Sequence, residues 1–124
     1  MATHPTTIRT SIANHVVDLI DGGTGNPNGQ MIFRSAGNAE LATLNFANPA
    51  FGAAVNGVAT ANAIADDTNA NAGTVSKCEL VDRAGNIIIE GTVGTTGTDI
   101  VVSSTTIPAG ATITVTNLTY TAPN

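Results

Sequence analysis

The sequence contains no tryptophan, three phenylalanines and one tyrosine, so aromatic side chains are scarce. Sugar sites commonly present aromatic rings, and ligand pockets in general are rich in aromatic side chains. The scarcity therefore disfavours a carbohydrate-binding or adhesin module, which stays a distant alternative because a β-sandwich can serve that role. It also leaves any hydrophobic core to Ile, Val, Leu and Ala.

Charged residues make up only 10% of the chain, and four of them are cations. These cations, Arg9, Arg34, Lys77 and Arg83, are scattered along the sequence. Nucleic-acid binding requires clustered cations that displace counterions from phosphates. We therefore expect no direct contact with DNA or RNA, and the net charge of −5 favours solubility instead.

Long hydrophobic runs are absent too. Apolar runs stay short, as in Ile87-Ile88-Ile89, whereas a membrane helix needs roughly 20 apolar residues. The first residues lack the basic-then-apolar order of a signal peptide. The single cysteine, Cys78, cannot form a disulfide within the chain, which agrees with a reducing compartment of synthesis. The sequence thus predicts synthesis in a host cytoplasm and no membrane partner.

The length of 124 residues fits one domain, and we predict a single β-sandwich domain over residues 1–124. The 13 glycines and abundant threonine favour short strands joined by turns over a helical bundle. One amphipathic helix is predicted over residues 6–21, because apolar residues recur there at spacings of three and four. They are Ile8, Ile12, Val16, Leu19 and Ile20. Pro5 supplies a start signal for this helix, and Gly22-Gly23 supplies an end.

The region 29–120 changes to a period of two or to short apolar runs, which predicts about seven strands. The candidates are residues 31–33, 41–46, 57–64, 74–81, 87–93, 100–103 and 112–120. Turn residues separate them, and the hairpin across Ala84-Gly85-Asn86 is the most clearly marked. In the last candidate the apolar phase slips near Asn117, which predicts a β-bulge. The predicted fold is mainly β: an antiparallel β-sandwich or jelly-roll-like barrel with one N-terminal helix.

Histidine and cysteine offer little for catalysis or zinc binding. The two histidines, His4 and His15, lie before and within the predicted helix, far in sequence from Cys78. A nucleophile and base could still meet in space, but a solvated His15 and a buried Cys78 are the simpler interpretation. Zinc prefers several Cys or His ligands at short spacing, which this chain lacks.

Acidic residues and glycines allow further interpretations that we weigh against structural ones. Asp66-Asp67 could bind calcium, but the spacing matches no EF-hand and an acidic turn is simpler. Paired carboxylates for glycoside cleavage could come from four acidic residues, but such sites use aromatic platforms. They are Glu40, Glu79, Glu90 and Asp99. Gly22, Gly23 and Gly25 follow a helix, whereas phosphate-binding glycines precede one. We therefore predict no enzyme and no catalytic, cofactor or metal site.

The segments 41–46 (LATLNF), 48–54 (NPAFGAA) and 57–64 (GVATANAI) resemble small structural proteins of tailed bacteriophages. The resemblance continues through residues 82–98 and 107–111 (IPAGA), and it departs from the family pattern in the loop 22–29. It implies a virion component, most specifically a decoration or cement protein on the head surface. A tail or neck component of the virion is the alternative within this class.

A protein without a reactive site acts through its surfaces, and the sequence offers two of them. One is the helix face, for which we predict a subunit or capsid contact through Ile8, Ile12, Val16 and Leu19; covering the protein's own sandwich is the competing interpretation. The other is exposed strand edges, which a neighbouring strand can extend. The predicted partners are the major capsid protein and further copies of this chain, as a homotrimer or homodimer. Repeated weak contacts on a lattice would stabilise the head by mass action.

Overall fold

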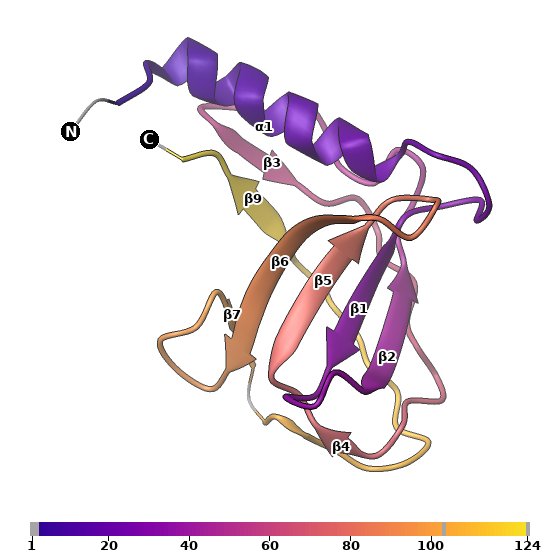
Figure 1. Ribbon diagram of the computed structural model, residues 1–124. Helices are drawn as coiled ribbons and strands as arrows, with labels where there is room; N and C mark the ends of the chain where they lie inside the picture. The colour runs from indigo at the N-terminus through magenta and orange to yellow at the C-terminus, as the bar shows by residue number, and fades with distance from the viewer. Residues whose placement is uncertain (1–2, 103, 124) are drawn as a thin grey trace.

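The computed structural model describes residues 3–102 and 104–123, which form a mainly β structure with one N-terminal helix (Figure 1). The predicted fold class is confirmed in these respects. The helix α1 spans Thr6–Ile20, close to the predicted 6–21. Pro5 precedes it in an extended conformation, as expected where the missing N–H of proline costs no helical hydrogen bond. None of the described helices is long and apolar enough to cross a membrane.

A five-stranded sheet forms the larger part of the β structure, with the order β2-β1-β5-β6-β7. Its strands are β1 (Gln30–Arg34), β2 (Glu40–Asn45), β5 (Lys77–Val81), β6 (Ile87–Gly94) and β7 (Ile100–Val101). Neighbours pair antiparallel except β6 and β7, which are parallel. The predicted strand 100–103 is thus shorter, and its last residue, Ser103, lies outside the described residues.

The predicted hairpin between β5 and β6 is confirmed, and a carboxylate organises its turn. Asp82 Oδ1 accepts hydrogen bonds from the backbone N–H groups of Ala84 and Asn86, both at 2.9 Å. The loop 22–29 is attached to this turn, because Arg83 N–H donates to Gly22 O at 3.0 Å and Asn26 N–H donates to Arg83 O at 2.9 Å. The loop after the helix is therefore part of the framework.

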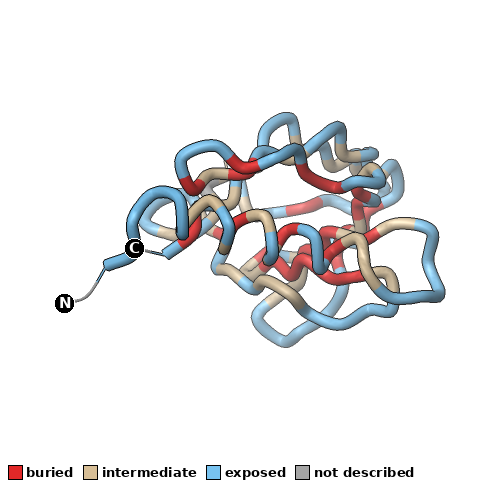
Figure 2. The backbone as a smooth tube through the Cα atoms, turned by 90° about the horizontal axis from the view of Figure 1, so that it is seen from above, coloured by how far each residue is buried: buried red, intermediate tan, exposed pale blue. Residues whose placement is uncertain are grey.

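One face of the sheet carries the hydrophobic core. Across the strands, Phe33 stands opposite Ala42 and Cys78, and Met31 stands opposite Leu44 and Leu80. All of these side chains are buried. Burial does not alternate along β1 and β5, because Ile32 and Glu79 on their other face are also only 8% and 5% exposed. Figure 2 shows buried residues running through the interior.

The rest of the β structure, called the second layer below, is made of short, separate ladders. β3 (Val58–Thr60) pairs with β9 (Thr119–Thr121), and β4 (Gly73–Thr74) pairs with β8 (Thr106–Ile107). Isolated bridges join Phe46 to Ile64, Phe51 to Ala61 and Asp67 to Ile113. The predicted strands 57–64 and 112–120 are therefore largely wrong as continuous strands, and the expected bulge near Asn117 is replaced by a stretch without a ladder.

The helix lies across one end of the β structure, where it contacts β3, β6 and β9 (Figure 1). Its buried residues are Ala13, Val17 and Ile20. Gly29 is required where the chain returns from α1 to β1, because a Cβ there would lie 2.4 Å from Ile20 Cγ2 and 2.7 Å from Ile20 O. The close approach of loop and helix fixes the end of α1 against the sheet.

Candidate docking surface

The four residues of the predicted contact face, Ile8, Ile12, Val16 and Leu19, are called the helix stripe below. Ile8 and Leu19 are 46% and 43% exposed, while Ile12 and Val16 are half-buried. Ile12 packs against the core. Ile12 therefore helps to cover the protein's own core, as the competing interpretation expects. Ile8 and Leu19, at the two ends of the stripe, face solvent and remain accessible for contact with a partner.

The helix stripe is not the face on which the helix rests. At 100° per residue, the centre of the stripe lies roughly 110° around the helix axis from the row Ala13, Val17 and Ile20. That row is buried to between 0% and 2% exposure. The helix therefore uses one apolar row for its own fold and leaves a second row at the margin of the buried face.

Polar side chains fix the orientation of the helix. Gly57 N–H donates to Thr10 Oγ1 at 2.9 Å, and Ala54 N–H donates to Asn14 Oδ1 at 2.8 Å. At the end of the helix, Ala50 N–H donates to Asp21 Oδ1 at 2.8 Å. Each bond satisfies a backbone donor that would otherwise lack a partner at the helix contact. Because the bonds are spread along the helix, they hold the two ends of the stripe, Ile8 and Leu19, facing solvent.

The turn at Asn56-Gly57 brings the last of these backbone donors, Gly57 N–H, to the helix. Both residues have positive φ angles, 53° and 80°, and Val55 and Val58 exchange backbone hydrogen bonds of 2.9 and 3.0 Å. Asn-Gly at two positive-φ positions is the sequence signal of a two-residue hairpin turn. No turn was predicted here, although the sequence carries this local signal. The side chain of Arg9 packs directly against Gly57.

The residues considered for nucleophilic chemistry are not gathered into a site. His4 and His15 are both exposed, whereas Cys78 is buried in β5. Burial raises the pKa of the Cys78 thiol to about 12, and the neighbouring Glu79 carboxylate adds to the rise. A thiol with that pKa is almost wholly protonated near neutral pH, and the thiolate is the reactive form.

Asp67 has a structural role in the acidic turn. Its Oδ2 accepts from Thr43 N–H at 2.8 Å, and its Oδ1 accepts from Asn69 N–H at 2.9 Å. Within residues 3–102 and 104–123, no group of three or more His, Cys, Asp or Glu side chains lies together in a way that could hold a metal ion.

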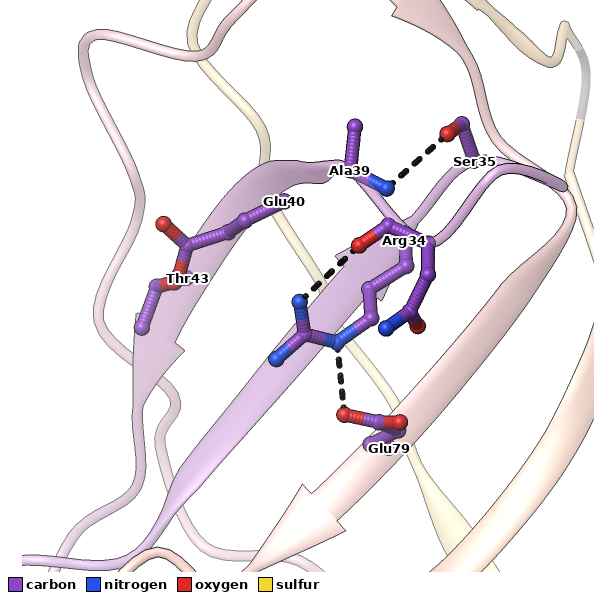
Figure 3. Close-up of polar contacts among 7 residues, drawn as sticks. Arg34, Ser35, Ala39, Glu40, Thr43 and Glu79 are labelled. Carbon is purple, nitrogen blue, oxygen red and sulfur yellow. Dashed lines mark hydrogen bonds and ion pairs between the residues drawn. The ribbon is translucent and has the colours of Figure 1, made fainter.

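The four carboxylates considered for glycoside cleavage do not form one site. Glu79 lies on the sheet face away from the core, opposite Glu90 on β6. Arg34 Nε donates to Glu79 Oε1 at 2.7 Å, and Arg34 Nη1 donates to Asn38 O at 3.3 Å (Figure 3). Glu40, on the edge strand β2, accepts from the Thr43 hydroxyl. The ion pair accounts for the burial of Glu79, which is 5% exposed.

Glu90 and Asp99 line one hollow of about 380 Å³ together with Tyr120, an arrangement that the spacing in sequence did not indicate. Asp99 Oδ2 accepts from Thr92 N–H at 2.9 Å and from the Thr92 hydroxyl at 3.2 Å. The Asp99 carboxylate thus closes the turn between β6 and β7, and Glu90 is exposed.

Comparisons with protein-family models, with curated proteins and with solved structures find no match to this chain. The candidate site therefore depends on the geometry of the chain itself. Val55 and Ile87 are exposed apolar residues too, but the helix stripe combines two exposed apolar ends with hydrogen bonds on the other side of the helix that hold it in place.

Proposed function

We propose that the protein is a structural component of a tailed-phage virion, and specifically a decoration or cement protein that binds the major capsid protein lattice. The observation that carries the proposal is the exposure of Ile8 and Leu19 on a helix whose opposite side is anchored to the fold. A contiguous row of apolar side chains held at a surface favours contact with another protein. The resemblance of residues 41–64 to phage structural proteins supplies the identity of that partner.

The size of the contact fits repeated weak binding. Ile8 and Leu19 are eleven residues apart, so they lie roughly 16 Å apart along the helix axis. Full burial of an Ile or Leu side chain yields about 1.5–3 kcal/mol, and each of these two is already more than half covered. The pair would therefore contribute about 2 kcal/mol per bound copy. A contact of this size becomes effective when many copies act on a preformed lattice or bind as oligomers.

The proposed action is stabilisation without chemistry. A protein that binds the assembled shell and not its disrupted state shifts the equilibrium toward the shell by RT ln(1 + [L]/Kd). The partners in this proposal are the major capsid protein and other copies of the chain, at the outer surface of the head, after synthesis in the bacterial cytoplasm.

The direct experiment adds the purified protein to phage heads that have been stripped of accessory proteins and images them by electron cryomicroscopy. Ordered density repeated at twofold or threefold positions of the lattice supports the proposal. Density confined to the tail vertex assigns the protein to the tail or neck instead, and heads without added density contradict a virion role at the shell.

A further inference from the structure

Residues 114–117 form an extended stretch with an unpaired backbone. On one side of it, Ile113 and Asp67 exchange backbone hydrogen bonds of 2.7 and 3.1 Å. On the other side, Leu118 O accepts from Ala61 N–H at 2.8 Å. Between these anchors, none of the backbone groups of residues 114–117 forms a hydrogen bond to another described residue. Thr114, Thr116 and Asn117 are exposed, so water can reach these backbone groups, and a neighbouring strand can replace that water at an unpaired edge.

An apolar cavity of about 360 Å³ lies beside this stretch. Ile100 and Val102 line it from the edge of the five-stranded sheet, Met31 and Phe33 line it from the inner sheet face, and the whole of 113–118 lines it as well. On its other flank, the stretch is separated from residues 61–64 by a smaller gap of about 80 Å³. The open edge therefore adjoins a hydrophobic space that protein side chains leave unfilled.

The cavity lies between residues 114–117 and the β7 edge of the sheet, where no backbone pairing joins the described strands. The free side of β2 is joined to the segment that follows β3, because Ala65 N–H donates to Asn45 O and Asn71 N–H donates to Leu41 O. That segment is joined in turn to residues 111–113. At the opposite end of the sheet, β7 pairs with β6. A strand placed between residues 114–117 and β7 could form backbone hydrogen bonds on this side.

We propose that a second copy of this chain occupies the open edge, with residues 114–117 of the two copies paired antiparallel about a twofold axis. Antiparallel pairing satisfies the groups that alternate residues direct toward one edge. A twofold axis makes the contact self-complementary, as most homodimer contacts are. The proposal deepens the self-association within the proposed function and does not depend on binding to heads.

The lack of charge at this edge permits a like copy to approach it. The chain has a net charge of −5, yet residues 100–124 contain no charged residue at all. No charged residue lines the 360 Å³ cavity either, and the exposed side chains of the stretch are Thr114, Thr116 and Asn117. Two acidic molecules can therefore approach here without placing like charges opposite each other. Natural strand edges that stay monomeric commonly carry a lysine or a proline, and this one carries neither.

The pairing is small, so the dimer should be weak in solution. Stable interfaces bury about 1,200–2,000 Å² in total, and a four-residue strand pair with one filled cavity falls below that range. We expect a dissociation constant in the micromolar to millimolar range. Attachment to a lattice would raise the local concentration and strengthen the pairing.

The test is sedimentation equilibrium of the full chain across protein concentrations of roughly 10 μM to 1 mM. Thr116→Lys places a positive charge on each copy at the twofold contact, and Thr96→Lys makes the same charge change in the exposed loop between β6 and β7. We expect wild type and Thr96→Lys to dimerise alike, and Thr116→Lys to raise the dissociation constant at least tenfold. Circular dichroism checks that both variants keep the wild-type fold.

Hydrogen exchange locates the contact. Under the proposal, the amides of residues 114–117 exchange rapidly in dilute protein and become protected as the concentration rises. A chain that is monomeric throughout overturns the proposal, as does a dimer in which these amides stay unprotected. A dimer that is dissociated by Leu19→Lys and not by Thr116→Lys would place self-association at the helix stripe instead.

Discussion

Two neighbouring helix residues should respond very differently to truncation. Ile20 is 0% exposed and packs against the backbone at Gly29, whereas Leu19 is 43% exposed. Replacing a buried Leu or Ile by Ala costs about 2–5 kcal/mol, because the lost apolar contacts and the remaining cavity both count. We expect Ile20→Ala to lower the free energy of unfolding by about 3 kcal/mol and Leu19→Ala by no more than about 1 kcal/mol.

Urea denaturation followed by far-ultraviolet circular dichroism measures this difference. With a urea slope of about 1.5 kcal/mol per molar, Ile20→Ala should lower the midpoint by about 2 M and Leu19→Ala by less than about 0.7 M. Both substitutions replace an apolar helix residue by the strongest helix former, so helix propensity does not explain a difference between them. Equal losses, or a larger loss for Leu19→Ala, would refute the assignment of the buried and exposed helix rows.

Three further outcomes follow from particular contacts. Gly57→Ala should lower stability by about 1–2 kcal/mol in thermal melts, and more than Gly97→Ala, because both glycines have positive φ but only the first has side-chain atoms within 3.4 Å of the added Cβ. Hydrogen bonds from Asn86, first of all its backbone N–H, hold the pKa of Asp82 below its usual value, so the carboxylate stabilises the fold above the unfolded-state pKa. That stabilisation should disappear as the pH falls through the lowered pKa, and Asp82→Asn should flatten this part of a stability-against-pH curve. The Cys78 thiol, whose pKa is raised to about 12, should resist a thiol-specific reagent at pH 8 in the folded protein and react on unfolding in urea; rapid reaction without denaturant would contradict its burial.

The helix and the β5–β6 hairpin could be predicted because each is encoded locally. Apolar spacing of three and four residues places α1, and Gly85-Asn86 marks the turn that Asp82 organises. Which row of the helix is buried is a tertiary property. The larger residues of the helix stripe indicated one row, but the small Ala13 lies in the row that is buried, where a small side chain permits close contact.

The second layer could not be predicted in detail, because strand pairing depends on the partner. Residues 111–116 alternate between half-buried and exposed, as the sequence indicated. No ladder forms over 114–117, however, and Ile64 in the facing segment pairs with Phe46. The Asn56-Gly57 turn was a local signal that could have been used, whereas the capture of backbone N–H groups by Thr10 and Asn14 requires the folded chain.

The most direct test of the docking surface measures binding of the protein to stripped heads with one charge placed on the helix stripe and one placed off it. Leu19→Lys alters the stripe, and Ser11→Lys makes the same charge change at an exposed helix position outside it. The account predicts that Leu19→Lys weakens binding at least about tenfold, which corresponds to 1.4 kcal/mol, while Ser11→Lys binds as wild type does. Equal binding by the two variants, with both correctly folded, would contradict the assignment of the helix stripe as the capsid contact.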